Sequence, residues 1–459
     1  MRQVFKHIAY AVVAMAFTTL WAQQIIKAPR IVFKGMGRAD SAFVCRDTLE
    51  LPLSLPGMLV GERDTLTFDS GLERFYSGLD SLRQGKDTII RIVHLGDSHI
   101  QAGYYSGRMM RLMHETFGNA GRGWIAPYKL GRTNEPSDYF ISSVIRNWSS
   151  GKCTQRESRR KAPVGLGGFG ISAVSPSINF DVIIAPNNGK GYSFNKAILY
   201  RGRKSMPMLP AGDRKADVTY RPADTVCAAN LVADTFLVSS LTDTLELQSS
   251  RRKKGTDRLL PAYSFRNVYY GLSLENGNPG ILYHSIGVNG AMYVNYTDTA
   301  YVEQLAQLKP DLIIVSMGTN ESFGRNFRAE EFEGQIHALV SLLKDKMPET
   351  ALLLTTPPEC YRRVTVNKKR VYKRNENTQA VAEAIVKVAR EDSLACWDLF
   401  NATGGKNSSR KWLDYKLLGR DRIHFTKEGY KEQGTLLFRG MMNSYLREET
   451  RGRGDEGTS

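Results

Sequence analysis

The sequence predicts an α/β protein in which a flavodoxin-like parallel sheet is interrupted by an inserted antiparallel, β-sandwich-like domain. Two stretches of the chain alternate continuous apolar runs with helix-like segments, which is the pattern of βαβ units in a parallel sheet. Between them, from about Thr133 to Ser273, short apolar runs are punctuated by Gly, Pro, Asn and Asp, as in antiparallel strands. A chain of 459 residues is long enough for two or three such units.

The N-terminus has the layout of a secretory signal peptide. Arg2 and Lys6 precede the short apolar run Ile8–Leu20, and Ala22 offers a small residue for cleavage. We therefore expect residues 1–22 to be a signal peptide and the protein to be exported to the periplasm or the exterior. The apolar run is shorter than the roughly 20 residues of a spanning helix, and an uncleaved anchor is the alternative.

The first α/β stretch begins with Ile89–Leu95, which reads IIRIVHL. This run is apolar apart from two residues, as expected of a central parallel strand that is covered on both faces. A helix should follow, because Tyr104, Met109 and Met113 recur near helical spacing. We assign residues 23–132 to an N-terminal segment and the first part of the α/β domain.

The α/β pattern resumes after the insertion, which we place at 133–273, and residues 274–449 form the second part of the α/β domain. Buried strands are expected at Ile281–Ile286, Leu312–Ser316, Ala351–Thr355 and Leu394–Leu399. Helices are expected at Val302–Leu308, Ala329–Lys346, Asn375–Glu391 and Lys427–Arg447. Residues 450–459 are polar and Gly-rich and should form a flexible tail.

The charge balance favours an anionic partner, since the formal net charge is +17. The basic residues gather in clusters at Arg156–Lys161, Arg251–Lys254 and Lys368–Lys373, and no nucleic-acid motif surrounds them. For an exported protein we therefore expect envelope polymers, with peripheral association to an anionic surface, and no nucleic acid.

The cysteines do not form a disulfide framework, because five in so long a chain are too few: Cys45, Cys153, Cys227, Cys360 and Cys396. Cys153 and Cys227 pair if their region folds as one unit, and free buried thiols are the alternative. No CxxC and no His/Cys cluster with zinc spacing occurs, so no structural metal is expected.

A candidate nucleophile directly follows the first strand, in the segment Gly96-Asp97-Ser98-His99. A Ser at this position lies on the sheet edge where open α/β folds place their ligands. The following helix can lend backbone N–H groups to a developing anion. By itself the segment is a weak signal, because a Ser before a helix is more often only an N-cap.

A candidate base and its orienting acid lie just before the last predicted helix, in Asp421-Arg422-Ile423-His424. A Ser hydroxyl becomes a good nucleophile only when a base takes its proton and a carboxylate orients that base. His424 and Asp421 can supply both from one short loop. A surface acid beside a capping His is the simpler interpretation, but the placement after the last strand favours the catalytic one.

Two Gly-Asn segments complete the pattern, one after the second strand of the α/β pattern and one after the third: Gly287-Val288-Asn289-Gly290-Ala291 and Gly318-Thr319-Asn320-Glu321. Taken singly, each is more often a turn. Acyl transfer passes through an oxyanion that needs preplaced donors. A Gly backbone N–H and an Asn amide can provide them, together with the N–H of Ser98.

The order GDS, GVNGA, GTNE and DxxH, each block at a strand end, resembles the SGNH (GDSL-like) hydrolase family. The resemblance covers about 88–124 and 276–446. It implies that Ser98 is the nucleophile, that Gly290 and Asn320 are oxyanion-hole donors with Ser98, and that Asp421 orients His424. His99 departs from the Leu usual after GDS, and Glu321 from the Asp that often follows the block-three Asn.

GDSH, NGA and the position of the insertion resemble the peptidoglycan O-acetylesterase branch, in which a carbohydrate-binding-like β module is inserted at the same place. The resemblance implies a secreted serine esterase that hydrolyses O-acetyl or other short acyl esters on a cell-envelope glycan through an acyl-enzyme, without cofactor or metal. The alternatives are a lipase or thioesterase on longer acyl chains, and a non-catalytic glycan-binding protein that keeps the scaffold.

Overall fold

The computed structural model describes residues 31–32, 48–49, 64–185, 192–223, 227–250 and 266–455. The expected signal peptide, Cys45 and the basic cluster Arg251–Lys254 lie outside these ranges. No helix within them is long and apolar enough to cross a membrane.

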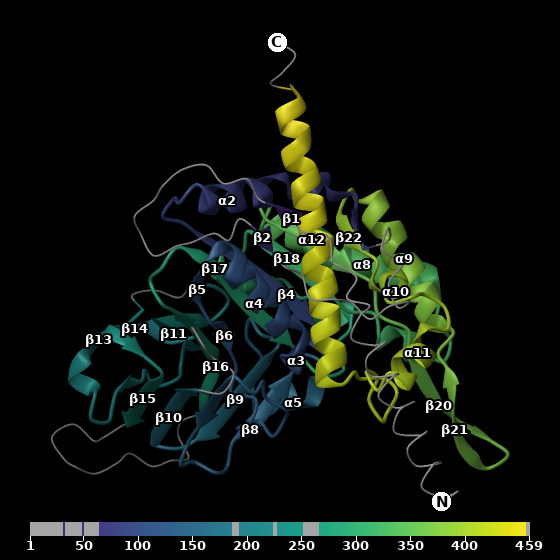
Figure 1. The fold of residues 1–459 in the computed structure, drawn as a ribbon. Helices are drawn as coiled ribbons and strands as arrows, with labels where there is room; N and C mark the ends of the chain where they lie inside the picture. The colour runs from purple at the N-terminus through teal and green to yellow at the C-terminus, as the bar shows by residue number, and fades with distance from the viewer. Residues whose placement is uncertain are drawn as a thin grey trace, which may run out of the picture.

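A seven-stranded sheet forms the centre of the molecule (Figure 1). Five parallel strands make its core: β4 (Ile89–Gly96), β17 (Gly280–Gly287), β18 (Leu312–Ser316), β19 (Ala351–Thr355) and β22 (Ala395–Trp397). Numbered along the chain, they stand in the sheet as 2-1-3-4-5, which is the flavodoxin-like order. The predicted fold class is therefore confirmed.

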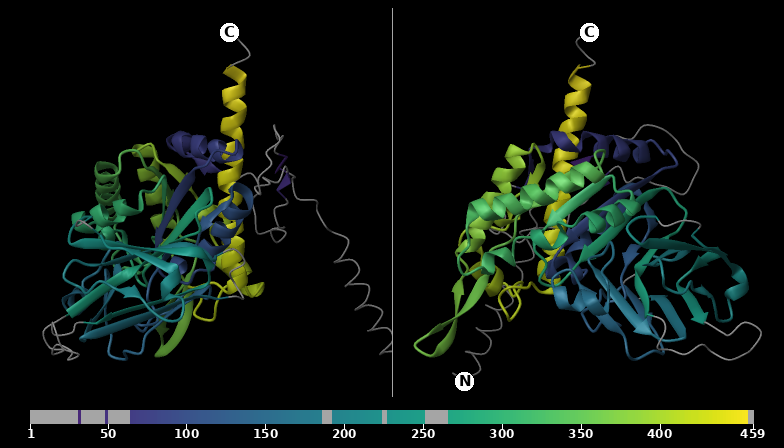
Figure 2. Two further views of the ribbon diagram at one scale, coloured as in Figure 1. Left: turned by 90° about the vertical axis from the view of Figure 1, so that its left-hand side faces the viewer. Right: turned by 180° about the vertical axis from the view of Figure 1, so that it is seen from behind.

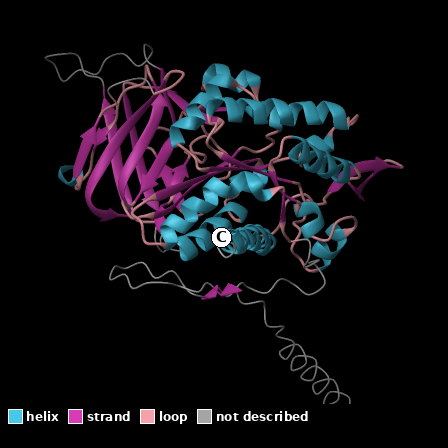
Figure 3. Ribbon diagram, turned by 90° about the horizontal axis from the view of Figure 1, so that it is seen from above, coloured by secondary structure: helices cyan, strands magenta, loops and turns pink. Residues whose placement is uncertain are grey.

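Short strands extend the two edges of this sheet, and helices cover both of its faces (Figure 3). The edge strands are β5 (Asn119–Gly121), parallel to β17, and β3 (Leu66–Thr67), antiparallel to β22. The main helices are α2 (Glu73–Arg83), α4 (Tyr105–Phe117), α7 (Thr299–Leu305), α8 (Ala329–Lys346), α9 (Asn377–Glu391) and α12 (Lys427–Asp455). All residues of β18 and β19 are buried, as expected for strands between two helical layers.

Helix α12 differs from the prediction at its C-terminal end, because it continues to Asp455 instead of ending at Arg447. Its first part packs against α4, and its last turns project beyond the body of the molecule (Figure 2). The backbone therefore remains helical past the region that packs against α4.

Two antiparallel sheets pack face to face beside the parallel sheet. The smaller contains β12 (Leu209–Pro210), β15 (Thr244–Ser250), β10 (Ser177–Ile184) and β7 (Tyr139–Ser142). The larger contains β13 (Val218–Arg221), β14 (Leu231–Thr242), β11 (Phe194–Gly202), β16 (Arg266–Glu275), β9 (Phe169–Val174), β8 (Ser149–Lys152) and β6 (Gly123–Ile125). The ring centroids of Phe180 and Tyr269, one from each sheet, lie 5.0 Å apart in the core between them.

The chain passes between the parallel and antiparallel sheets at two adjacent places. β5 continues into β6 on the way out, and β16 continues into β17 on the way back. Residues before 133 thus already take part in an antiparallel sheet. At this crossing Gly121 and Gly123 have positive φ, and a Cβ on either would meet the carbonyl of Leu274 or Tyr283 at 2.4 Å.

The described structure contains one hairpin that was not predicted, and its cysteines follow one of the two predicted alternatives. The basic stretch that contains Lys368–Lys373 forms a projecting hairpin, β20 (Tyr361–Val366) and β21 (Lys369–Arg374) (Figure 1). Cys153 and Cys227 do not pair, because one is buried and the other exposed; Cys360 and Cys396 are also free thiols.

Candidate active site

The predicted site residues meet at the carboxyl ends of the parallel strands. Ser98 is the first residue of α3 (Ser98–Gln101), directly after β4. Gly290 follows β17, Asn320 follows β18, and His424 lies just before α12. The backbone turns sharply into α3 because Asp97 caps it: Asp97 Oδ1 accepts a hydrogen bond from the N–H of His99 at 2.9 Å.

Three of these side chains form one hydrogen-bonded chain. Ser98 Oγ lies 2.8 Å from His424 Nε2, and His424 Nδ1 lies 2.7 Å from Asp421 Oδ2. The other oxygen of Asp421 accepts hydrogen bonds from the backbone N–H groups of Ile423 and His424, both at 3.0 Å. The carboxylate therefore holds the loop and the imidazole ring together, in the geometry of a nucleophile, base and orienting acid.

The electrostatics of this chain favour a charged acid and a basic imidazole. Burial alone would raise the pKa of Asp421, but the hydrogen bonds from the His424 side chain and from two backbone amides hold it well below its ordinary value. The hydrogen bond to Asp421 in turn raises the pKa of His424 above 6.5, against the opposing effect of burial. Above that pKa, His424 is neutral and can accept a proton from Ser98.

The two predicted oxyanion-hole donors lie on the same pocket as Ser98. Gly290 has a φ of +80°, and a Cβ added to it would meet no other atom within 4 Å. The Asn320 amide donates to the carbonyl of Ala291 at 2.9 Å and to Asp97 Oδ2 at 3.1 Å. In this state both N–H bonds of that amide are therefore used within the protein, so an oxyanion would have to replace one of these two acceptors.

The pocket around Ser98 has a volume of about 690 Å³. Its wall combines polar groups with the side chains of Tyr104, Phe323, Phe425 and Tyr430. Asn134 contributes to the wall from the segment between β6 and β7. It is held there by Asn289, whose Nδ2 donates to Asn134 Oδ1 at 2.6 Å.

His99 lies next to the hydrogen-bonded side chains of the site, and its contacts there were not predicted from the sequence. Its Nδ1 lies 2.9 Å from the Tyr430 hydroxyl, and its ring centroid lies 5.2 Å from that of His424. Burial lowers the pKa of His99 to about 3, so the ring stays neutral and fills a position where the family usually has Leu. In the sequence, His99 stood out only because the family usually has Leu at this position.

Arg422 is a second residue whose contacts near the site were not predicted from the sequence. It has a φ of 59°, and its guanidinium lies 4.4 Å from the ring centre of Tyr372 and 5.4 Å from that of Tyr361. The backbone N–H of Tyr361 donates to the carbonyl of Arg422 at 2.9 Å. The β20–β21 hairpin thus supports the loop that carries Asp421 and His424, a contact visible only in the folded chain.

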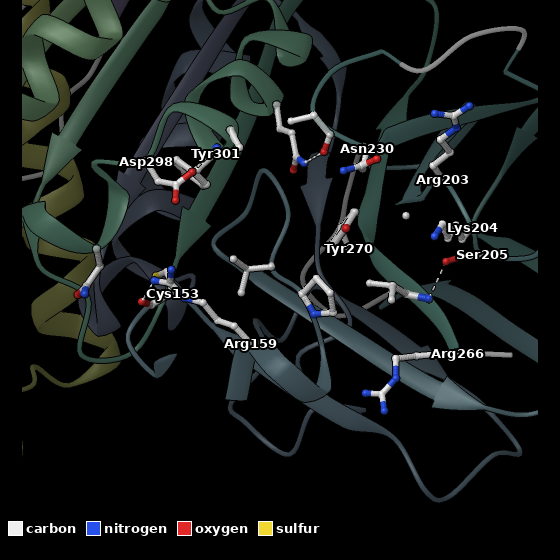
Figure 4. A pocket seen from close by; sticks show the side chains of 18 residues that line it. Cys153, Arg159, Arg203, Lys204, Ser205, Asn230, Arg266, Tyr270, Asp298 and Tyr301 are labelled. Carbon is white, nitrogen blue, oxygen red and sulfur yellow. Dashed lines mark hydrogen bonds between the residues drawn. The ribbon is translucent and has the colours of Figure 1, made fainter. Parts of the chain in front are cut away.

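A second cavity, of about 650 Å³, lies between the larger antiparallel sheet and α7. Figure 4 shows its lining, which includes Cys153, Arg159, Lys204, Tyr270 and Asp298. It contains none of the predicted site residues. Across the described part of the chain, no three His, Cys, Asp or Glu side chains gather as a metal site.

Comparison with known proteins defines the class of protein to which this fold and site correspond. Residues 249–432 match the model of the GDSL-like Lipase/Acylhydrolase family. These residues form a GDSL-like acylhydrolase domain, and the hydrogen-bonded chain of Ser98, His424 and Asp421 is that of a serine ester hydrolase. Ser98 lies outside the matched residues, because most strands of the antiparallel sheets come between Ser98 and residue 249 in the sequence.

Among solved structures, the chain is similar to a peptidoglycan O-acetylesterase, at 21% identity and a TM-score of 0.63. That alignment covers 83% of this chain and 99% of the other, so the likeness in fold extends over the antiparallel sheets as well. A lipase/acylhydrolase from Enterococcus faecalis aligns over 36% of this chain and 77% of its own, with 17% identity and a TM-score of 0.27. No curated protein matches the sequence significantly.

Proposed function

We propose that this hydrolase is an exported esterase that removes O-acetyl or other short acyl groups from a cell-envelope glycan such as peptidoglycan. The observation that carries the proposal is the hydrogen-bonded chain from Ser98 through His424 to Asp421 at the edge of an open pocket. The signal-peptide pattern of residues 1–22 supports export.

The reaction begins when Ser98 Oγ attacks the ester carbonyl carbon while His424 Nε2 takes its proton. The carbonyl oxygen becomes an oxyanion, which the backbone N–H groups of Ser98 and Gly290 and the amide of Asn320 stabilise. For this the amide exchanges one of its two present bonds, to Asp97 or to the Ala291 carbonyl, for one to the oxyanion. Asp421 remains ionised throughout and stabilises the imidazolium that forms.

The tetrahedral intermediate then collapses, and the bond from the carbonyl carbon to the sugar oxygen breaks. His424 gives its proton to that oxygen, so the free glycan hydroxyl leaves and the acyl group remains on Ser98. A water molecule attacks this acyl-enzyme with His424 again as the base. Collapse of the second intermediate releases acetate and returns the proton to Ser98. His424 takes up and returns the proton in each of these steps.

Three observations support a glycan as the carrier of the ester. The pocket is open, and the half-buried side chains of Tyr104 and Phe323 line it together with polar groups. The fold is also similar, over 83% of the chain, to that of a peptidoglycan O-acetylesterase. The excess of positive charge is compatible with an acidic polymer.

Acetate release tests this proposal directly. The purified protein should release more acetate from O-acetylated peptidoglycan than from O-acetylated xylan, and a Ser98→Ala variant should release none above background. On nitrophenyl esters, acetate should be preferred over long acyl chains. A preference for long chains would support the lipase or thioesterase alternative. Retained glycan binding without any turnover would support a non-catalytic protein.

A further inference from the structure

We propose that the β20–β21 hairpin is a docking arm that binds a carboxylate-bearing envelope glycan and holds it beside the Ser98 pocket. This inference deepens the proposed function and rests on it for the identity of the polymer. Figures 1 and 2 show the hairpin extending away from the rest of the α/β fold, and its residues 365–370 are all exposed.

The hairpin carries positive charge without any acidic side chain. Residues 361–374 read YRRVTVNKKRVYKR and contain seven cations: Arg362, Arg363, Lys368, Lys369, Arg370, Lys373 and Arg374. Five of them are exposed: Arg363, Lys368, Lys369, Arg370 and Lys373. Within the described chain the seven make a single ion pair, from Arg374 to Glu359 at 3.4 Å.

This arrangement costs stability in the free protein. Arg362 and Lys373 stand directly opposite each other across the two strands, and like charges in such a pair are destabilising. A two-stranded hairpin is at best marginally stable by itself. An anionic partner would relieve the repulsion between these cations.

The base of the hairpin lies against the catalytic loop and against the pocket wall. Tyr361 and Tyr372 contact the guanidinium of Arg422, which stands between Asp421 and His424 in the sequence. On the other side Arg362 donates to the carbonyl of Phe323, which lines the Ser98 pocket, at 3.0 Å. The base of the hairpin therefore lies beside the wall of the Ser98 pocket, so a polymer bound along the hairpin can continue from it to that pocket.

The distribution of the cations favours a chain of repeated anions over a single small ion. They are spread along both strands of six paired residues, a length of roughly 20 Å at about 3.4 Å per residue, and do not converge on one point. Peptidoglycan has this character, because carboxylates recur along its length. The polymer that carries the ester can therefore also supply the anions.

Two other macromolecular partners fit less well. The large apolar side chain exposed on the hairpin is Val366, at 40%, and this is too little to anchor the arm in a lipid bilayer. Single-stranded nucleic acid binds by stacking its bases on aromatic faces. Tyr361 and Tyr372 already stack on Arg422, so they do not offer such a platform.

The test compares two variants of the full-length protein that lose the same charge. The arm variant K369Q/R370Q/K373Q removes three exposed cations of β21. The control variant K86Q/K215Q/K309Q removes three exposed lysines. Lys86 and Lys309 lie before the amino ends of β4 and β18, whereas Ser98 follows the carboxyl end of β4. Both are mixed with purified peptidoglycan sacculi, and the bound fraction is measured by sedimentation.

The arm variant should bind sacculi roughly tenfold more weakly than the wild type, and the control variant within about twofold of it. The difference should vanish at about 0.5 M salt, because salt screens exposed charges. Hydrolysis of nitrophenyl acetate should be unchanged in both variants, which shows that the Ser98 pocket remains intact.

Equal binding by the arm variant and the wild type would overturn the proposal, as would an equal loss in the control variant. Binding to anionic phospholipid vesicles that depends on the arm, with unchanged binding to sacculi, would also overturn it in favour of a membrane surface. The assay needs no turnover. A protein that binds sacculi through the arm but releases no acetate would refute the esterase function and leave the docking arm standing.

Discussion

The molecule contains two pockets of nearly equal volume, about 690 Å³ around Ser98 and about 650 Å³ beside α7, and they differ in chemistry. In the first, a hydroxyl, an imidazole and a carboxylate form a continuous hydrogen-bonded chain. In the second, the Cys153 thiol is buried, and burial raises its pKa to about 12, which keeps it protonated and unreactive. The comparison teaches that an activated nucleophile, not the size of the cavity, distinguishes the candidate active site.

The largest effect should come from the nucleophile. Ser98→Ala should lower kcat for ester hydrolysis by roughly 10⁴–10⁶-fold, because no other group in the pocket can replace the attacking oxygen. Cys153→Ala in the second pocket is the matched control and should keep kcat within about twofold. A serine-directed phosphonate should label the wild type once, at Ser98. Labelling elsewhere, or activity in the Ala variant, would contradict the assignment.

The next largest effect should come from the carboxylate that orients the base. Asp421→Asn should lower kcat by roughly 10³–10⁴-fold, because the amide no longer fixes the tautomer of His424 or stabilises its charged form. Asp298→Asn provides the control in the second pocket. Asp298 caps α7, accepting from the N–H of Tyr301 at 3.1 Å, and Asn caps a helix equally well. Equal losses in the two variants would mean that Asp421 acts on stability only.

A smaller effect is expected at the oxyanion hole. Asn320→Ala should lower kcat by roughly 10²–10³-fold with little change in KM, since the amide acts on charge that develops in the transition state. The substitution also removes the hydrogen bond to Asp97, so thermal unfolding is measured alongside the kinetics. A rise in KM with kcat unchanged would make Asn320 a binding residue.

The smallest effect is a displacement of the pH profile. Because the hydrogen bond to Asp421 raises the pKa of His424 above 6.5, kcat/KM should fall as the pH drops through a midpoint above 6.5. In the Asp421→Asn variant the cause of the increase is gone, so the midpoint of the residual activity should move toward acid. An unchanged midpoint would show that another group titrates.

Much of the fold was predictable because the parallel strands are buried on both faces. Leu312–Ser316 and Ala351–Thr355 are strands with the predicted bounds, since a continuous apolar run between turn residues has few other uses. The basic hairpin was not predicted. Its strands read YRRVTV and KRVYKR, with cations in adjacent pairs and no buried residue, so neither a period of two nor an apolar run marks them in the sequence.

The same distinction applies to the candidate site. Ser98, Gly290, Asn320, Asp421 and His424 were found because each stands at the end of a recognisable strand or just before a helix. Asn134, His99 and Arg422 were not identified as parts of the site. Their contacts depend on which loops meet above the sheet, and no local spacing encodes that meeting.

By itself the sequence determined the alternation of buried strands and helices, and with it the order of four motif blocks along a parallel sheet. Only the tertiary structure decided that Ser98 and His424, 326 residues apart, lie 2.8 Å from each other. It alone decided that the Asn320 amide is already paired with Asp97, and that a cationic hairpin supports the catalytic loop through Arg422. The physical reason is the separation of the interacting residues along the sequence. Strand and helix patterns arise from neighbouring residues, whereas a site forms where packing of the core brings distant loops together.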